Sequence, residues 1–142
     1  MLDSASLHRF VAAQDPVYER VLAELRQGRK SSHWMWYVFP QIAGLGLSQM
    51  SRHYAIADLA EARAYLADPV LGARLRECTA LVNAVTGRSI HEIFGSPDDM
   101  KFQASMTLFQ AAAADPAARA LFHTALQKFF GGESHPGTLA RL

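Results

Sequence analysis

The chain has 142 residues, of which 50% are hydrophobic and 19% charged, and its formal net charge is +1 with histidine neutral. This balance is typical of a globular domain and excludes a disordered chain. The small net charge provides no basic surface for duplex nucleic acid or an anionic membrane. The single cysteine cannot form an internal disulfide, and no apolar run could span a bilayer. We therefore expect one cytoplasmic domain over residues 1–142, with neither duplex nucleic acid nor a membrane as partner.

Helix signals follow one another along the chain. Capping residues precede prolines, as at helix N-termini, in Asp15-Pro16, Asp68-Pro69, Ser96-Pro97 and Asp115-Pro116. Capping-box spacing indicates two further N-termini, at Asp58 with Glu61 and at Ser89 with Glu92. Apolar residues between these points recur every three or four positions, and no segment alternates as a strand does. The sequence predicts an all-α fold, a single compact multi-helical domain of about six to eight helices.

The segment KSSHWMWYVFPQIAGLGLS, residues 30–48, is the longest stretch without a clear helical face, and it holds both tryptophans. Trp and Tyr rings can stack on planar ligands such as nucleobases. A lysine and the backbone N–H groups of a Gly-x-Gly turn can meet a phosphate. The candidate ligand-binding residues here are Lys30, Trp34, Trp36, Tyr37, Gln41, Gly44 and Gly46. The alternative is a hydrophobic cap in which the tryptophans fill core volume and the glycines turn the chain.

A second unusual segment is SPDDMKFQASMTLF, residues 96–109. As a helix, it has one ordinary apolar face and one face that mixes charge with aromatic rings: Asp98, Lys101, Phe102, Ser105 and Phe109. A half-buried groove suits such a face, with Lys101 neutralising an anionic ligand and Ser105 beside it. The alternative is a surface ion pair of Asp98 with Lys101 next to ordinary helix packing.

The histidines give no sign of a metal site, because no two of them are spaced three or four residues apart and one cysteine cannot complete a zinc site. We expect no metal and no cofactor. His33 lies among the aromatic residues close to Lys30, which makes it the candidate for acid–base chemistry.

Six stretches of the chain are distinctive: RFVAAQ, GRKSSHWMWYVFPQIAGLGLS, YAI, EARAYLADPVLGARLREC, IFGSPDDMKFQASMTLF and FFGGESHPGTLARL. They resemble a bacterial family of unknown function, the one numbered eighteen-ten, whose members are often labelled "calpastatin". The resemblance implies an all-helical domain and brings no settled activity. Calpain-inhibiting segments are disordered polar repeats, so the label does not suit this composition. Where the family usually has Ser-Ser-Met-Thr-Leu-Phe, this chain has Ala104 in place of the first serine.

The order of an early Trp-containing segment, an A-x-x-x-L-x-x-P-x-x-G-x-R-L helix and a later Lys-Phe helix is similar to the NADAR, or YbiA-like, family. Those small helical proteins process ADP-ribose and riboflavin-pathway derivatives through N-glycosidic bonds. Their C-terminal Asp-x-x-Trp-Gly is missing here. The similarity implies a class of ligand rather than a mechanism.

Two functions of different classes fit these residues. In the first, residues 30–48 and 98–109 form a cleft that binds a nucleotide-like or ADP-ribose-like small molecule and, as an N-glycosidase-type hydrolase, cleaves its glycosidic bond. Asp98 or Asp99 would then be the catalytic carboxylate, with His33 as a proton carrier. In the second, the aromatic segment 33–39 is the docking patch of a non-catalytic protein-interaction module. A structural core with the function elsewhere is the third reading.

Overall fold

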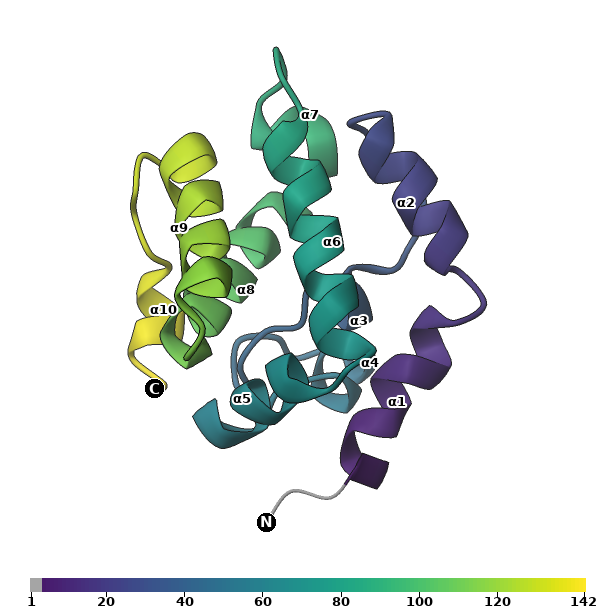
Figure 1. The fold of residues 1–142 in the computed structure, drawn as a ribbon, viewed down its shortest axis with the longest axis vertical. Coiled ribbons are helices and arrows are strands. Elements are labelled where there is room, and N and C mark those ends of the chain that lie inside the picture. The colour runs from purple at the N-terminus through teal and green to yellow at the C-terminus, as the bar shows by residue number, and fades with distance from the viewer. Residues whose placement is uncertain (1–3) are drawn as a thin grey trace.

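The computed structural model describes residues 4–142 (Figure 1), and within that range it contains helices and no strand. The all-α prediction is confirmed. The helices are α1 (Ser4–Gln14), α2 (Tyr18–Arg26), α3 (Met35–Val38), α4 (Gln49–His53), α5 (Leu59–Ala67), α6 (Leu71–Ala84), α7 (Ile90–Phe94), α8 (Asp98–Ala112), α9 (Pro116–Phe130) and α10 (Pro136–Leu139).

The predicted count of about six to eight helices is wrong, because residues 4–142 form ten. The difference comes from α3, α4, α7 and α10, which are only four or five residues long. Helices this short do not repeat their apolar positions, so periodicity cannot detect them. An isolated parallel bridge between Ile42 and Ile56 holds the segment around α4 at its two ends.

The predicted N-caps are partly confirmed. Asp58, Ser89 and Asp115 each accept a backbone N–H of the first turn of α5, α7 and α9, and the capping box of Ser89 with Glu92 is complete. The predictions at Asp15 and Ser96 are wrong, because α2 and α8 begin without a side-chain cap. In both cases the proline lies in the connecting turn instead of the helix.

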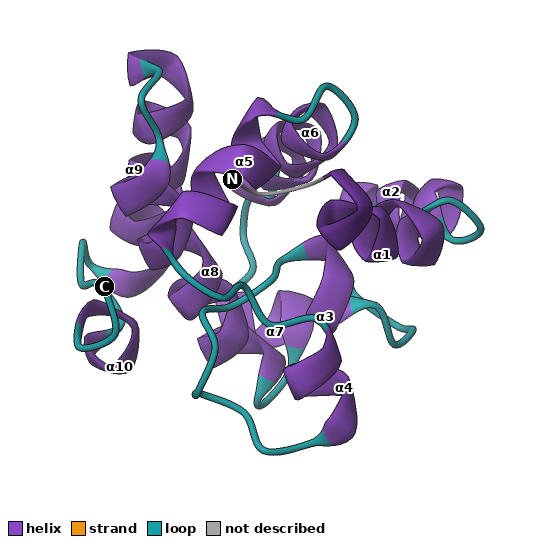
Figure 2. Ribbon diagram, turned by 90° about the horizontal axis from the view of Figure 1, so that it is seen from below, coloured by secondary structure: helices purple, strands orange, loops and turns teal. Residues whose placement is uncertain are grey.

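Helix α6 lies at the centre of the molecule in the view of Figure 1, with α2 packed on one side and α9 on the other. Helix α8 packs against α5, α7, α9 and α10 and is therefore enclosed along most of its length. Seen from below (Figure 2), α3 and α4 lie on one side of the molecule, and α9 and α10 lie on the other. The N-terminal turn of α8 lies near the loop that precedes α3.

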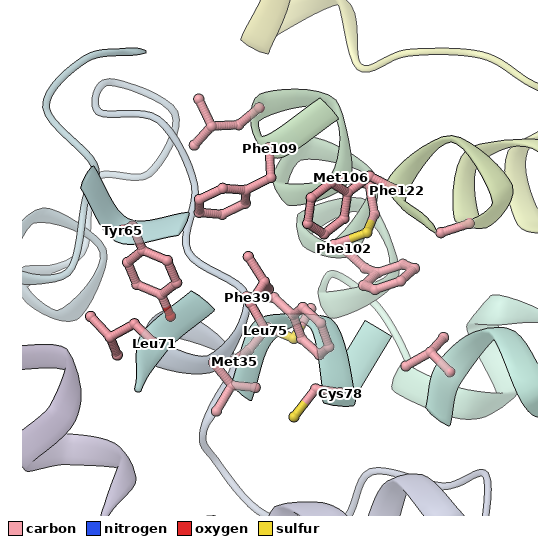
Figure 3. Packing of buried hydrophobic residues seen from close by; sticks show 14 of the residues in the cluster. Met35, Phe39, Tyr65, Leu71, Leu75, Cys78, Phe102, Met106, Phe109 and Phe122 are labelled. Atoms are coloured by element: carbon pink, nitrogen blue, oxygen red, sulfur yellow. The ribbon is translucent and has the colours of Figure 1, made fainter. Parts of the chain in front are cut away.

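The core is rich in aromatic rings contributed by several helices (Figure 3). Phe39 and Phe102 meet edge to face with ring centroids 5.0 Å apart, and Phe102 also stacks on Phe94 at 5.1 Å. Phe109 continues this cluster towards Tyr65 and Phe122. Two of the residues predicted for a half-buried groove, Phe102 and Phe109, are thus fully buried, because α8 is packed on both of its faces.

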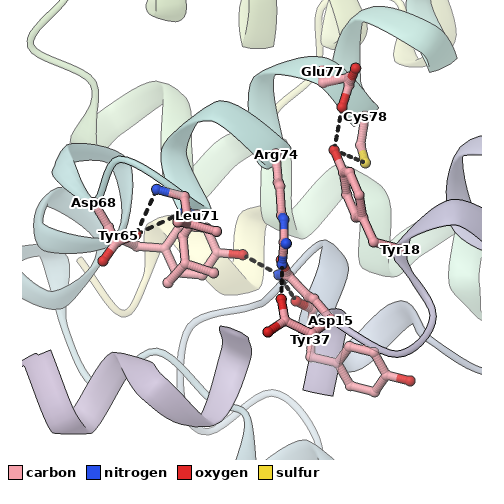
Figure 4. A network of polar contacts seen from close by, with 11 residues as sticks. Asp15, Tyr18, Tyr37, Tyr65, Asp68, Leu71, Arg74, Glu77 and Cys78 are labelled. Atoms are coloured by element: carbon pink, nitrogen blue, oxygen red, sulfur yellow. Dashed lines mark hydrogen bonds and ion pairs between the residues drawn. The ribbon is translucent and has the colours of Figure 1, made fainter. Parts of the chain in front are cut away.

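A network of polar contacts ties the α1–α2 region to α6 (Figure 4). Arg74 pairs with Asp15 at 2.9 Å, and the Tyr18 hydroxyl donates to Glu77 at 2.6 Å. Burial raises the pKa of the neighbouring Cys78 thiol to about 12, so this thiol stays protonated at neutral pH. The network positions helices and offers no nucleophile.

Candidate functional site

A cleft of about 390 Å³ opens between the loop before α3 and the turn from α7 to α8. We name it the cationic cleft, and its lining residues are Lys30, Ser31, Ser32, His33, Met35, Trp36, Phe94, Ser96, Pro97, Asp98 and Lys101. Both of the unusual sequence segments contribute to this lining. Among the predicted site residues, the fold brings together Lys30, His33, Trp36, Asp98 and Lys101.

Charge in the cationic cleft is centred on Asp98. One carboxylate oxygen lies 2.8 Å from the Lys30 ammonium, and the other lies 3.5 Å from the Lys101 ammonium. The Lys30 side chain is only 7% exposed. Two ammonium groups share one carboxylate, so the ionised side chains of the cleft leave an excess positive charge. Such a site attracts anions.

Each of these two lysines also faces a tryptophan. The Lys30 ammonium lies 5.1 Å from the ring centroid of Trp34, and the Lys101 ammonium lies 5.3 Å from that of Trp36. Both distances are in the range of cation–π attraction. The consequences differ, because Trp34 is 1% exposed and lies in the core, whereas Trp36 is half-buried and lines the cleft.

The loop that carries the cleft residues is anchored by Glu24 of α2, which the sequence analysis missed. Its carboxylate accepts the backbone N–H groups of Ser31 and Ser32, the Ser32 hydroxyl and the Trp34 indole N–H, at 2.6–3.1 Å. Burial alone would raise the pKa of Glu24, but these four hydrogen bonds outweigh it and lower the pKa to about 2. The available signal was a carboxylate three residues after buried Val21, on the apolar side of α2.

Three other predicted residues lie away from the cationic cleft. Trp34 packs beside Phe39 and Phe94, and its indole N–H is already bonded to Glu24. Tyr37 packs on Tyr54 with ring centroids 5.2 Å apart, outside the lining of the cleft. Ser105 is fully buried in α8. Of the three predicted stacking aromatics, the structure therefore presents only Trp36 to the cleft.

The two predicted carboxylates are also separated. Asp98 lines the cleft, whereas Asp99 contacts the His91 imidazole at 3.2 Å and accepts the backbone N–H of Met100. The His33 side chain is exposed at the rim of the cleft. A single carboxylate therefore faces the cavity, between its two lysines.

Gln41, Gly44 and Gly46 lie next to the cleft instead of inside it. They line two smaller pockets, of about 140 and 220 Å³, that share Gln41, Gly46 and Ser51. We call these two pockets together the side cavity. It borders the cationic cleft, because Trp36 lines the smaller pocket and Lys101 the larger one as well as the cleft.

The turn at the side cavity is held by the C-terminal segment. Gly44 has φ of +97°, and a Cβ there would come within 2.8 Å of the Arg141 Nε. The Arg141 guanidinium donates to the Gly44 carbonyl oxygen at 3.2 Å. Gly44 is therefore required for the turn, a role that the sequence analysis gave only as its alternative.

The described residues include neither a candidate metal site nor a candidate membrane-spanning helix. Residues 4–142 contain no group of three or more His, Cys, Asp or Glu side chains that could hold a metal ion. In that same part of the chain, no helix is both long and apolar enough to cross a membrane.

Two comparisons with known proteins give matches that cover nearly the whole chain. A crystal structure described as the conserved hypothetical protein Rv1873 from Mycobacterium tuberculosis is 54% identical, with a TM-score of 0.94. The similarity covers 99% of this chain and 98% of that one. Among curated proteins there is no significant match. The profile of the family described as "Protein of unknown function (DUF1810)" matches residues 4–142, and the chain therefore belongs to the DUF1810 family.

Proposed function

We propose that the cationic cleft binds a nucleotide-like or ADP-ribose-like small molecule, with a planar ring against Trp36 and a phosphate beside Lys101. The observation that carries this proposal is the position of the Lys101 ammonium, 5.3 Å from the Trp36 ring centroid within a cavity of about 390 Å³. A ring that stacks on the base and a cation beside the phosphate are the two features by which proteins bind nucleotides regardless of the base they carry.

The electrostatics of the cleft support an anionic ligand. Lys30 and Lys101 together carry one more charge than Asp98 can neutralise. A phosphate that enters beside Lys101 supplies the missing negative charge and adds charge-assisted hydrogen bonds. The Lys30 side chain is buried against the partly exposed Asp98, and Lys30 lies in the loop that Glu24 anchors, so this part of the site is organised before the ligand arrives.

The proposed reaction is hydrolysis of an N-glycosidic bond. Water adds to the anomeric carbon, and the carbon–nitrogen bond breaks with its electron pair left on the base nitrogen. The water proton that is lost ends on that nitrogen for a neutral nucleobase, and it is released to solvent for NAD, whose pyridinium nitrogen becomes neutral when it takes the electron pair. Positive charge develops on the ribosyl ring, and the Asp98 carboxylate stabilises it. His33, at the rim, carries the proton.

A protein-docking patch at segment 33–39 is less well supported. Its side chains Trp34, Met35, Val38 and Phe39 are buried. The remaining aromatic side chains, Trp36 and Tyr37, are half-buried, and the Trp36 ring lines a concave cleft. A docking patch needs several exposed neighbouring side chains, and this segment offers few.

Binding is tested by a thermal-shift titration of the purified protein with AMP and ADP-ribose. A ligand at 100 times its Kd adds about 2.7 kcal/mol to the free energy of unfolding. We expect a shift with the wild type that disappears in Trp36→Ala and Lys101→Met and persists in Lys128→Met, the matched lysine outside the cleft. No shift with either ligand, or an equal shift in all variants, contradicts the proposal.

Hydrolysis is tested separately, by incubating the protein with NAD and ADP-ribosyl compounds and detecting the released base by chromatography. Asp98→Asn is expected to abolish release while AMP still binds, because the amide keeps the shape and loses the charge. Asp99→Asn is the matched control, since Asp99 contacts His91 outside the cleft. Equal release by wild type and Asp98→Asn excludes the hydrolytic part.

A further inference from the structure

Trp36 and Lys101 stand between two cavities. The cationic cleft shares these two residues with the side cavity, whose pockets measure about 140 and 220 Å³. Trp36 borders the cleft and the smaller pocket, and Lys101 borders the cleft and the larger one. A molecule that fills both cavities has to pass this pair.

The chemistry of the side cavity differs from that of the cleft. Its lining includes Arg52, Ser51 and Gln41, whose side chains carry a guanidinium, a hydroxyl and an amide. Among residues 4–142, no carboxylate lines either of its pockets. In the described part of the chain, Arg52 forms no ion pair within 4 Å, so its charge is available to a ligand. These groups suit an anion together with a hydroxyl-bearing group such as a sugar.

From this arrangement we infer that the preferred ligand is a nucleoside diphosphate joined to a second, sugar-like group, and that the side cavity holds this second group. The inference rests on the proposed function and narrows it, since a mononucleotide would occupy the cationic cleft alone. The diphosphate lies at Lys101, with one organic group on each side.

Charge placement favours a diphosphate over a single phosphate at this junction. Lys101 borders both cavities, while Arg52 adds a second cation on the far side only. Asp98 already balances one of the two lysines of the cleft. A diphosphate spreads its negative charge over two neighbouring phosphates, so it extends from Lys101 towards the side cavity that Arg52 lines, whereas a single phosphate holds its charge at one point.

The two cavities also differ in how their space is divided. The cationic cleft is one space of about 390 Å³ with Trp36 in its lining, which suits a base with its ribose. The side cavity consists of two smaller pockets, of about 140 and 220 Å³, beside the turn at Gly46, where a Cβ would come within 2.5 Å of the Ser51 Oγ. Each of these pockets suits a sugar-sized group better than a second base with its ribose.

The experiment compares AMP with ADP-ribose by isothermal titration calorimetry at one salt concentration. We expect ADP-ribose to bind about tenfold more tightly than AMP, because the second half gains at least one charge-assisted hydrogen bond. Arg52→Ala is expected to remove most of that preference and to change the Kd of AMP less than about twofold. Gln41→Ala, on the same cavity, should reduce the preference in the same direction.

Arg26→Ala is the matched control, an exposed arginine of α2 that lines neither cavity. Equal Kd values for AMP and ADP-ribose overturn the inference and leave the proposed function standing. An Arg52→Ala variant that weakens both ligands equally also overturns it, because the arginine then acts on the shared half. If neither ligand binds to the wild type, the proposed function fails and the inference fails with it.

Discussion

Trp34 and Trp36 are separated by one residue, and their surroundings are opposite. Trp34 is buried with its indole N–H bonded to Glu24, so all of its bonding capacity is used inside the protein. Trp36 is half-buried at the junction of the two cavities, beside Lys101. The first tryptophan fixes the loop, and the second presents a ring at the position that the fixed loop gives it.

Within a short segment, a residue whose hydrogen-bonding groups are used by the fold can therefore lie next but one to a residue that is available to a ligand. The criterion that separates them is whether the hydrogen-bonding groups of the side chain are already used. The Glu24 carboxylate accepts four hydrogen bonds, and the indole N–H of Trp34 donates one of them. A ligand site needs groups whose capacity is not used up by the fold. The following predictions test whether the two halves of the segment are separable in this way.

The largest expected effect is on stability at Trp34. Trp34→Ala should lower the free energy of unfolding by about 3–5 kcal/mol, because it leaves a cavity and deprives Glu24 of a donor. Trp36→Ala should cost only about 1 kcal/mol, since the ring is half exposed. Urea denaturation of both variants measures the difference. Similar losses for the two would break the distinction between them.

The next effect concerns Glu24 and depends on pH. Glu24→Gln should lower the free energy of unfolding by about 2–3 kcal/mol at neutral pH, since an amide cannot accept all four hydrogen bonds. The pKa of Glu24 falls from its ordinary value of 4.5 to about 2 in the folded protein. Between these two pH values the unfolded chain binds the extra proton, so acid favours unfolding there.

The measurement for Glu24 is therefore a denaturation series between pH 2 and pH 7. We expect the stability difference between wild type and Glu24→Gln to be complete above about pH 5 and to shrink as the pH falls towards 2. Glu19→Gln, on the exposed side of α2, is the matched control. A difference that stays constant over the whole range would mean that the carboxylate is not held ionised.

A smaller effect distinguishes the two lysines of the cleft. Lys30→Met should lower the free energy of unfolding by about 1–2 kcal/mol, because Lys30 is buried against Asp98. Lys101→Met should stay within about 0.5 kcal/mol, since Lys101 is more exposed and forms the longer contact. Paired urea titrations test this order. The reverse order would assign the structural role to Lys101 and remove it as the available cation.

The sequence predicts the helical part of this structure well, because its signals are local. The caps at Asp58, Ser89 and Asp115 use N–H groups within three residues, and each is found where it was expected. The lengths of the short helices α3 and α7 could not be predicted, because these helices lack such a local signal. A few residues hold no periodic pattern, and the stability of so short a helix comes from packing against distant segments.

The roles within the candidate site depend on contacts that are distant in the chain. Trp34 and Trp36 cannot be told apart without Glu24, which lies on another helix. Asp98 and Asp99 are equivalent as letters, but successive residues of a helix point in different directions, so Lys30 reaches one and His91 contacts the other. The residue types could be predicted from sequence, whereas their division into anchors and available groups could not.

Ser105 gives the smallest and most diagnostic prediction. It is fully buried in α8, and its hydroxyl oxygen has no hydrogen-bond partner among the described residues. A buried hydroxyl without a partner is a cost, so Ser105→Ala should leave the free energy of unfolding unchanged or raise it by about 0.5–1 kcal/mol. Thr107→Val is the contrasting variant, since the Thr107 hydroxyl donates to Gln103 and accepts from the His135 N–H, and its loss should destabilise.

Urea denaturation of the two variants measures these opposite signs. A stability loss in Ser105→Ala would show that the hydroxyl has a hydrogen-bond partner in the folded protein, and Ser105 would then belong with the satisfied groups, as Trp34 does. A neutral or positive change places it with the packed interior of α8. The preceding residue, Ala104, already lacks a hydroxyl. We therefore expect this turn of α8 to need its small volume and not its hydroxyl.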